Sequence, residues 1–377
     1  MKPYLIVTGD FVKTGGMDRA NYALARYLAD CGAETHLVAY RVDPELVERP
    51  NVIVHRVPKL IGSYLASGMM LSRAGRRWAG SVSARGGTVV VNGGNCRWGD
   101  INWVHYVHAA FERASSAALL QRVKNRAVHR HSLAQERKVL PSARVLVANS
   151  NRTRRDVIER LGISADRVFT VHYGIDPDEF RPFDSNERAA ARRALGMDPG
   201  RRTIAFVGAL GDGRKGFDAA FAAWQKLCAD PRWDVDLVVI GTGAELAIWK
   251  SRVAGAGLAE RIHFLGFRKD VANVLRACDA LVAPTRYEAY GLAVHEALCC
   301  ALPAIVSANA GVAERYPRQL ADLLIPEPAD AEVVAARLRT WRANADRFRA
   351  AVERLSCELR AHTWDRMAAQ FVEIASR

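Results

Sequence analysis

Short apolar runs alternate with segments of helical periodicity along most of this chain of 377 residues. Residues 4–8 form the first apolar run, residues 21–28 carry apolar side chains at helical spacing, and residues 35–39 form the next apolar run. A strand, a crossover helix and a second strand in this order are the opening of a doubly wound α/β domain. The alternation continues to about residue 173, and it predicts parallel sheets covered by helices.

One stretch interrupts this alternation. Residues 174–184 are rich in Pro and Asp and lack the periodicity of the flanking segments, as an interdomain linker does. A new apolar run begins near residue 203, and the alternation then continues to about residue 360. We predict one domain over residues 1–180, a second over residues 181–360 and a final helical segment over residues 361–377.

Composition limits the class of protein. Hydrophobic residues make up 50% of the chain, which suits two domains with substantial cores. No apolar run approaches the ~18 residues that span a bilayer, and the first residues pass directly into an apolar strand without a secretory leader pattern. The seven cysteines form neither a C-x-x-C pair nor a Cys/His cluster, which argues against a zinc site and a disulfide scaffold. We expect a cytoplasmic protein, and any association with the inner face of the membrane would be peripheral.

Two glutamates, Glu288 and Glu296, lie on either side of Gly291 at the start of an apolar helical pattern. This pattern follows an apolar run at residues 280–284, and open parallel sheets bind ligands at the carboxyl ends of their strands. The unpaired N–H groups and positive dipole end of a helix start favour an anion such as a diphosphate. Solvated helices also carry glutamates at this spacing. With its surroundings, however, the pair predicts a sugar-nucleotide site in which each carboxylate binds hydroxyls.

The motifs around this pair extend over nearly the whole chain. They are Phe-Val-Gly at 206–208, Arg-Lys-Gly at 214–216, Val-Val-Ile-Gly-Thr-Gly at 238–243, His-Phe-Leu-Gly at 263–266, Ala-Leu-Pro-Ala-Ile-Val-Ser at 301–307, and upstream Gly-Gly at 15–16, Val-Ala-Asn-Ser at 147–150 and Val-His-Tyr-Gly-Ile-Asp at 171–176. Together they resemble the retaining glycosyltransferases of family four. The resemblance implies the GT-B fold, which has two Rossmann-like doubly wound domains, a donor cleft between them, and a last helix that crosses back to the N-terminal domain.

The resemblance also implies roles for individual residues. Glu288 matches the family's first glutamate, which contacts the donor sugar and helps to stabilise the transition state, and Glu296 matches the second, which holds the ribose hydroxyls. Lys215 is assigned to the donor phosphates. Backbone groups that approach the diphosphate and the sugar are implied at Tyr290, Gly291 and Leu292 in the C-terminal domain and at Gly15 and Gly16 in the N-terminal domain.

The assignments of Arg214 and His108 do not follow from a direct match to the family's motifs. The family has an Arg directly after the first glycine of the 208–216 region, but this chain has Ala209 there, and we expect Arg214 to take its place. The family also carries a His close to the reacting sugar at the end of a strand, and His108 matches that position better than His105. We expect His108 to bind a sugar hydroxyl or the transition state. In the retaining mechanism proposed for such enzymes, the leaving phosphate itself can take the acceptor's proton.

The sequence argues against a metal ion or an organic cofactor. Asp234 and Asp236 match the D-x-D metal signature of the other large glycosyltransferase fold, but they lie at the start of an apolar run and read as strand-edge residues. His105 and His108 are three residues apart without a third ligand nearby. The Gly-Thr-Gly at 241–243 lacks the third glycine of a dinucleotide fingerprint, which argues against hydride transfer. We expect a metal-independent enzyme.

The net charge of +14 is concentrated in the first half of the chain, where residues 1–180 carry 26 Lys and Arg against 16 Asp and Glu. Residues 59–78 and 113–144 combine basic side chains with apolar positions at helical spacing. Both segments fit an anionic membrane surface that presents a lipid-linked acceptor, and equally they fit solvated or core-packed helices.

We therefore predict a retaining hexosyltransferase that uses a UDP- or GDP-sugar and a hydroxyl acceptor on a glycan or a lipid. Its place would be in the assembly of a cell-surface polysaccharide or glycolipid, and nucleic acid is not an expected partner. Two alternatives stay open. One is a non-catalytic or epimerase-like GT-B protein, and the other is a basic-surface protein that binds membranes or polyanions.

Overall fold

The computed structural model describes residues 2–60, 64–111, 119–211, 213–327 and 329–377, except the side chains of residues 64 and 119–125. These residues form two compact units. The first unit comprises residues 2–60, 64–111, 119–174 and 363–377, and the second comprises residues 175–211, 213–327 and 329–362. Each unit has its own parallel sheet and its own hydrophobic core.

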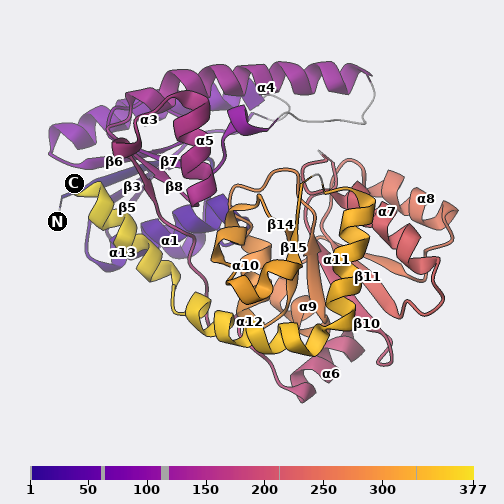
Figure 1. Cartoon of the computed structure of the whole chain (residues 1–377). Helices are drawn as coiled ribbons and strands as arrows, with labels where there is room; N and C mark the ends of the chain where they lie inside the picture. The colour runs from indigo at the N-terminus through magenta and orange to yellow at the C-terminus, as the bar shows by residue number, and fades with distance from the viewer. Residues whose placement is uncertain (1, 61–63, 112–118, 212, 328) are drawn as a thin grey trace. The chain divides into compact units, whose positions relative to one another are not determined.

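The sheet of the first unit has seven strands in the order β5-β3-β1-β6-β7-β8-β9, and its pairings are parallel (Figure 1). Every residue of the five inner strands is buried, whereas the edge strands β5 and β9 are partly exposed. This burial explains the continuous apolar runs, because helices cover both faces of a parallel sheet. The strands are β1 (Tyr4–Val7), β3 (Thr35–Ala39), β5 (Val52–Arg56), β6 (Thr88–Asn92), β7 (Ile101–Val104), β8 (Val145–Ala148) and β9 (Val168–Thr170).

The helices of the first unit include two long ones, α3 and α4 (Figure 1). The main helices are α1 (Gly16–Asp30), α2 (Pro44–Val47), α3 (Tyr64–Ala84), α4 (Leu119–Val139), α5 (Asn151–Leu161) and α13 (Trp364–Ala375). The short elements are β2 (Asp10–Phe11), β4 (Arg41–Val42) and the 3-10 helices η1 (His108–Ala110), η2 (Leu140–Ser142) and η3 (Ala165–Arg167). Within the described part of the chain, no helix is both long enough and apolar enough to cross a membrane.

The C-terminal helix α13 belongs to the first unit, where it packs beside α1 (Figure 1). The ring of Phe371 on α13 lies 4.6 Å from that of Trp103 on β7, measured between centroids. Trp364, at the start of α13, is 7% exposed. Arg26 of α1 also pairs with Asp365. The C-terminal helix α13 therefore packs into the core of the unit that contains the N-terminus.

The second unit has a parallel sheet of six strands in the order β12-β11-β10-β13-β14-β15. The strands are β10 (Arg202–Val207), β11 (Val235–Ile240), β12 (Ile262–Gly266), β13 (Ala280–Ala283), β14 (Ala304–Ser307) and β15 (Leu324–Ile325). The helices are α6 (Ser185–Ala194), α7 (Phe217–Cys228), α8 (Leu246–Gly255), α9 (Val271–Ala277), α10 (Leu292–Cys299), α11 (Ala331–Ala343) and α12 (Ala345–Arg360), with the 3-10 helices η4 (Gly311–Arg315) and η5 (Arg318–Leu323). Both sheets confirm the predicted doubly wound α/β class.

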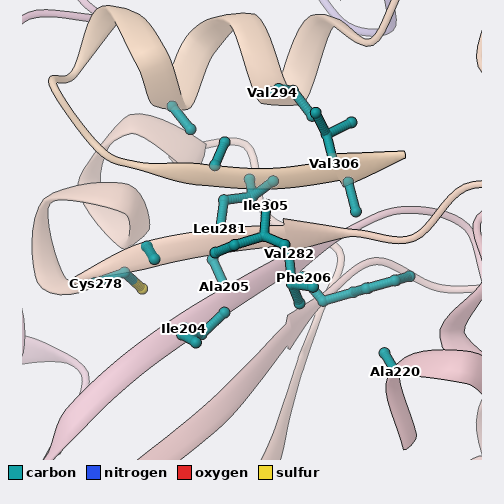
Figure 2. Packing of buried hydrophobic residues seen from close by; sticks show 14 of the residues in the cluster. Ile204, Ala205, Phe206, Ala220, Cys278, Leu281, Val282, Val294, Ile305 and Val306 are labelled. Atoms are coloured by element: carbon teal, nitrogen blue, oxygen red, sulfur yellow. The ribbon is translucent and has the colours of Figure 1, made fainter. Parts of the chain in front are cut away.

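The core of the second unit shows why its strands are apolar throughout. Side chains of β10, β13 and β14 lie between Val294 of α10 and Ala220 of α7 (Figure 2). The connections after β10 and β13 run in opposite directions along the sheet, and right-handed crossovers then place their helices on opposite faces. Each fully buried aliphatic side chain contributes about 1.5–3 kcal/mol by leaving water. A polar substitution at Val282 would therefore disrupt the packing on which the neighbouring loops depend.

Candidate functional site

The strand order of the second unit reverses between β10 and β13. At such a point the connections leave the sheet in opposite directions, so a crevice opens at the carboxyl ends of the two strands. Residues 208–216 follow β10, and residues 284–291 follow β13. A small pocket at this point is lined by side chains from both loops and from α10, among them Lys215, Glu288 and Ala293. The fold therefore brings together two loops that the sequence separates by about seventy residues.

Both predicted cations of the first loop lie against the carboxylate of the second. Lys215 donates from Nζ to Oε2 of Glu288. The Nη1 atom of Arg214 lies 3.7 Å from Oε1 of Glu288 and donates to the carbonyl oxygen of Tyr287 at 3.4 Å. The three charged side chains are 13–21% exposed, so solvent screens them less than it screens a surface pair. The residues assigned to the phosphates and to the sugar therefore neutralise each other in this structure.

Gly216 lets the two loops approach closely. It precedes α7 with a φ of 70°, in the left-handed region that favours glycine. A Cβ atom at this position would lie 1.8 Å from the carbonyl oxygen of Pro284. The glycine next to Lys215 is therefore required by the backbone contact.

The start of α10 is formed as the sequence predicts. Gly291 is the N-cap, with a φ of 110°, and no side chain caps the helix. The N–H groups of Val294 and His295 donate to the carbonyl oxygen of Gly291, so those of Leu292 and Ala293, at the very start of the helix, are the ones that can donate to an anion. The carbonyl oxygens of Glu288 and Tyr290 accept hydrogen bonds from the N–H groups of Gly311 and Val312, at 3.0 and 2.6 Å. These bonds hold the loop that carries Glu288 against η4.

His295 of α10 makes a contact with the Glu288 loop that was not predicted from the sequence. Its Nδ1 lies 2.5 Å from the hydroxyl of Tyr290, and both side chains are almost fully buried. This contact ties the loop to the helix that follows it. Glu296, the next residue, is 8% exposed. A lone histidine on an apolar helix gives no sequence signal of such a contact.

The remaining predicted residues, Gly15, Gly16 and His108, lie in the first unit. Gly15 is the N-cap of α1, and Gly16 is its first residue. The first turn of α1 also carries Asp18, whose pKa is raised to about 6 by burial and, secondly, by the charge of Asp10. Neither Asp18 nor Asp10 was predicted as a site residue from the sequence.

His108 begins the 3-10 helix η1, just after β7. The N–H groups of His108 and Ala109 donate to the two carboxylate oxygens of Glu136 on α4, at 2.8 and 2.9 Å. Glu136 is 2% exposed, and burial raises its pKa in spite of these two bonds. The backbone at His108 is therefore fixed by a buried carboxylate that the sequence analysis also missed.

His105 lies deeper in the first unit. Its Nδ1 is 2.6 Å from the hydroxyl of Tyr173, and its ring centroid is 4.6 Å from that of Trp103. Burial lowers its pKa to about 3, which keeps the ring neutral. His105 therefore has the surroundings of a packed core residue, and His108 stays the candidate of the two.

The two aspartates of the D-x-D sequence are bound to arginines. Asp236 accepts from Arg201 and from Arg261 at 2.8 Å, and Asp234 accepts from Arg342 at 2.8 Å. Asp236 lies in β11, and Asp234 directly precedes it. Both residues lie at the start of a strand, as predicted, and the structure adds that both are ion-pair partners. Across the described ranges, no group of three His, Cys, Asp or Glu side chains is placed to hold a metal ion.

Comparison with known proteins agrees with this architecture. Residues 14–179 match the model of "Glycosyltransferase Family 4", and residues 201–344 match that of "Glycosyl transferases group 1". A D-inositol 3-phosphate glycosyltransferase of Mycobacterium sp. (strain KMS) is 29% identical over 330 residues, which span 81% of this chain and 72% of that protein.

Two solved structures show the same fold. WaaG, a glycosyltransferase involved in lipopolysaccharide biosynthesis, has a TM-score of 0.77 at 19% identity over 99% of both chains. HepE of Anabaena in complex with UDP-glucose has a TM-score of 0.71 at 14% identity over 99% of both chains. The chain therefore belongs to the family-four glycosyltransferases, which have the GT-B fold, and it is a retaining, metal-independent enzyme that uses a nucleotide-sugar donor.

Proposed function

We propose that this enzyme moves a hexosyl unit from a UDP- or GDP-sugar to a hydroxyl acceptor, and that the switch point of its second unit binds the donor. The observation that carries the proposal is the cluster of Lys215 and Arg214 around Glu288, beside the start of α10. Cations, the N–H groups of a helix start and a carboxylate in one partly buried crevice match the chemical groups of a sugar diphosphate.

The reaction needs this arrangement because negative charge grows on the departing diphosphate. Lys215, Arg214 and the N–H groups after Gly291 would stabilise that charge, and fixed groups in a partly dry site do so without reorganisation. When the phosphates take the two cations, the carboxylate of Glu288 is released from its ion pairs. It is then available to the sugar, whose anomeric carbon becomes positive as the bond breaks.

Other residues complete the proposed donor site. Tyr290, Gly291 and Leu292 contribute backbone groups, and Glu296 holds the ribose hydroxyls. Gly15, Gly16 and His108 are the proposed contributions of the first unit, with His108 at the reacting sugar. The acceptor's proton passes to the leaving phosphate, so no side chain has to act as a general base.

The acceptor side is proposed from charge and from the relatives. Residues 1–180 carry the larger part of the positive charge, which suits an anionic acceptor. The names of two relatives, D-inositol 3-phosphate glycosyltransferase and WaaG of lipopolysaccharide biosynthesis, concern a phosphorylated acceptor and a cell-surface glycolipid. We propose a glycan or lipid-linked acceptor in cell-surface polysaccharide or glycolipid assembly.

A peripheral position on the inner face of the membrane is supported by α3. Leu65 and Met69, one turn apart, are 43% and 66% exposed, and Arg73 and Arg76 follow them on the same helix. Exposed apolar side chains next to basic ones suit an anionic lipid surface. Of the basic residues in the other predicted segment, the side chains of Arg122 and Lys124 lie outside the described residues.

A thermal-shift panel of UDP, GDP, ADP and their common sugar conjugates tests the donor assignment. A ligand that binds only the folded state raises the unfolding temperature by mass action. Selective stabilisation by UDP or GDP, lost in Lys215→Ala, is the expected result. If none of these nucleotides changes the unfolding temperature, the proposed donor site and the choice of UDP or GDP are wrong.

A further inference from the structure

Arg286 joins the two loops of the proposed donor site. Its backbone N–H donates to the carbonyl oxygen of Arg214 at 2.9 Å, and its Nη1 donates to the carbonyl oxygen of Gly213 at 2.7 Å. The same guanidinium pairs with Asp218 in the first turn of α7, from Nη1 to Oδ1 at 2.8 Å and from Nη2 to Oδ2 at 2.5 Å. One residue of the loop after β13 therefore binds the loop after β10 and the helix that follows it.

We propose that Arg286 is a positioning residue of the donor site, which fixes the cations Arg214 and Lys215 relative to the carboxylate of Glu288. The inference rests on the proposed function and deepens it. Arg286 lies two residues before Glu288, and the carbonyl groups that it binds belong to the residues just before Lys215. It therefore constrains the backbone next to each charged group.

The two-point contact between Arg286 and Asp218 requires an arginine. A planar guanidinium bound to both oxygens of a carboxylate fixes direction as well as distance, which a lysine ammonium cannot do. Burial alone would raise the pKa of Asp218, but the bond from Arg286 lowers it below its ordinary value. Arg286 and Asp218 are therefore both charged at neutral pH, and the cation of Arg286 is already neutralised by Asp218.

Arg286 should contribute most to the geometry of the site when the donor is bound. In this structure Lys215 and Glu288 attract each other directly, which would hold the two loops together even without Arg286. A diphosphate that takes Lys215 removes that attraction. The bonds from Arg286 to the 213–214 backbone and to Asp218 do not involve Lys215, so they continue to hold the loops in register. Loss of the Arg286 side chain removes the bonds to Gly213 and Asp218 but leaves the backbone bond to Arg214, so it should weaken donor binding and transfer more than it weakens the fold.

The chain offers a matched control for Arg286→Ala. Arg342 forms the same two-point pair with Asp234, at 2.8 and 2.5 Å, and it joins α11 to the residue before β11. The side chains of Arg286 and Asp218 are 41% and 44% exposed, and those of Arg342 and Asp234 are 35% and 41% exposed. Exposed ion pairs contribute little to stability, so both variants should fold and lose similar amounts of it.

The experiment compares Arg286→Ala with Arg342→Ala by initial-rate kinetics at varied donor and by calorimetric titration with UDP, or with GDP if the thermal-shift panel selects it. Arg286→Ala should raise the donor KM and the nucleotide Kd about ten- to hundredfold and leave the acceptor KM unchanged, because a small misplacement of binding groups has an effect of this size. Arg342→Ala should change neither constant. Millimolar guanidinium should partly restore Arg286→Ala, since it can occupy the vacated place beside Asp218.

Four variants distinguish a wrong donor site from a wrong role for Arg286. If Lys215→Ala leaves the nucleotide Kd unchanged, the donor site itself is wrongly placed. If Lys215→Ala weakens binding but Arg286→Ala behaves like Arg342→Ala, the positioning role alone is wrong. Should Arg286→Ala fail to fold, Arg286→Lys keeps the charge and loses the two-point geometry. A donor KM for Arg286→Lys equal to that of the unmodified enzyme would overturn the proposal, and a raised KM would support it.

Discussion

The strand order reverses at one point in each sheet, between β1 and β6 in the first unit and between β10 and β13 in the second. The loops at these two points differ in charge. Lys215 and Arg214 lie against a single carboxylate in the second unit, whereas the first unit places Asp10 and Asp18 close enough for the charge of Asp10 to contribute to the raised pKa of Asp18. The shared topology fixes where a ligand can bind, and the loop residues decide what kind of ligand it is.

The different charges of the two loop regions suggest different roles for the two units in donor binding. The cations and the free helix start of the second unit suit a diphosphate. In the first unit, Asp18 lies in the first turn of α1, and Asp10 is already paired with Arg41 at 2.6 Å. The proposed contribution of the first unit is therefore the backbone at Gly15 and Gly16, and the second unit supplies the cations for the phosphates. Variants in both units test this division.

Removal of either half of the Lys215 and Glu288 pair should have the largest effect. We expect Glu288→Ala and Lys215→Ala each to lower turnover by more than about a hundredfold, because each removes charge stabilisation from the transition state. Lys226→Ala is the control, since Lys226 pairs with Glu332 on more exposed surface of the same unit. Initial rates at saturating donor measure the effect, and thermal unfolding checks the fold. Turnover close to that of the unmodified enzyme would remove the chemistry from this switch point.

Gly216→Ala tests whether the close contact of the two loops is essential to the second unit. A Cβ atom there would meet the Pro284 carbonyl, and a left-handed backbone already disfavours alanine, so we expect a loss of about 3 kcal/mol in the free energy of unfolding. Gly257 has the same left-handed φ of about 70°, but no atom lies within 4 Å of an added Cβ. Gly257→Ala should therefore lose only about 1 kcal/mol. Denaturant unfolding compares them, and equal losses would show that the loops can separate.

Glu136→Gln tests the contribution of the first unit. A glutamine keeps one oxygen acceptor but replaces the other with a donor, so the N–H of either His108 or Ala109 loses its partner. We expect kcat to fall about tenfold as His108 moves, with a smaller change in the donor KM. Glu187→Gln is the control, because Glu187 also accepts from a backbone N–H, that of Asp184, in the second unit. An unchanged kcat would argue that His108 lies outside the reaction.

Asp18→Asn should have the smallest effect of these variants, a change in the free energy of unfolding that depends on pH. The folded protein holds the Asp18 proton more tightly than the unfolded chain, so stability falls as the pH rises from 3.8 to about 6. We expect Asn to raise the free energy of unfolding by about 1 kcal/mol above pH 6 and to change nothing below pH 3.8. Denaturant unfolding at several pH values measures this difference. A difference that does not change with pH would mean that Asp18 has its ordinary pKa.

Much of the second unit's site was predictable from the sequence. Glu288 and Gly291 follow one apolar strand, Lys215 follows another, and the carboxyl ends of parallel strands meet at one edge of the sheet. Arg286 and His295 were not predictable in the same way. Arg286 acts through Asp218, 68 residues away in the chain, and His295 through a buried contact with Tyr290. No periodicity marks such pairs, because they form only after the strands have been ordered.

Periodicity and local motifs are properties of neighbouring residues, so the two doubly wound sheets, the family and the position of the charged loops could be predicted from the sequence. The contacts of Lys215 and Arg214 with Glu288, of Arg286 with both loops and of Glu136 with the backbone at His108 are visible only in the folded chain. Hydrogen bonds and ion pairs depend on distances of a few ångströms between atoms, and only folding sets those distances for residues far apart in the chain.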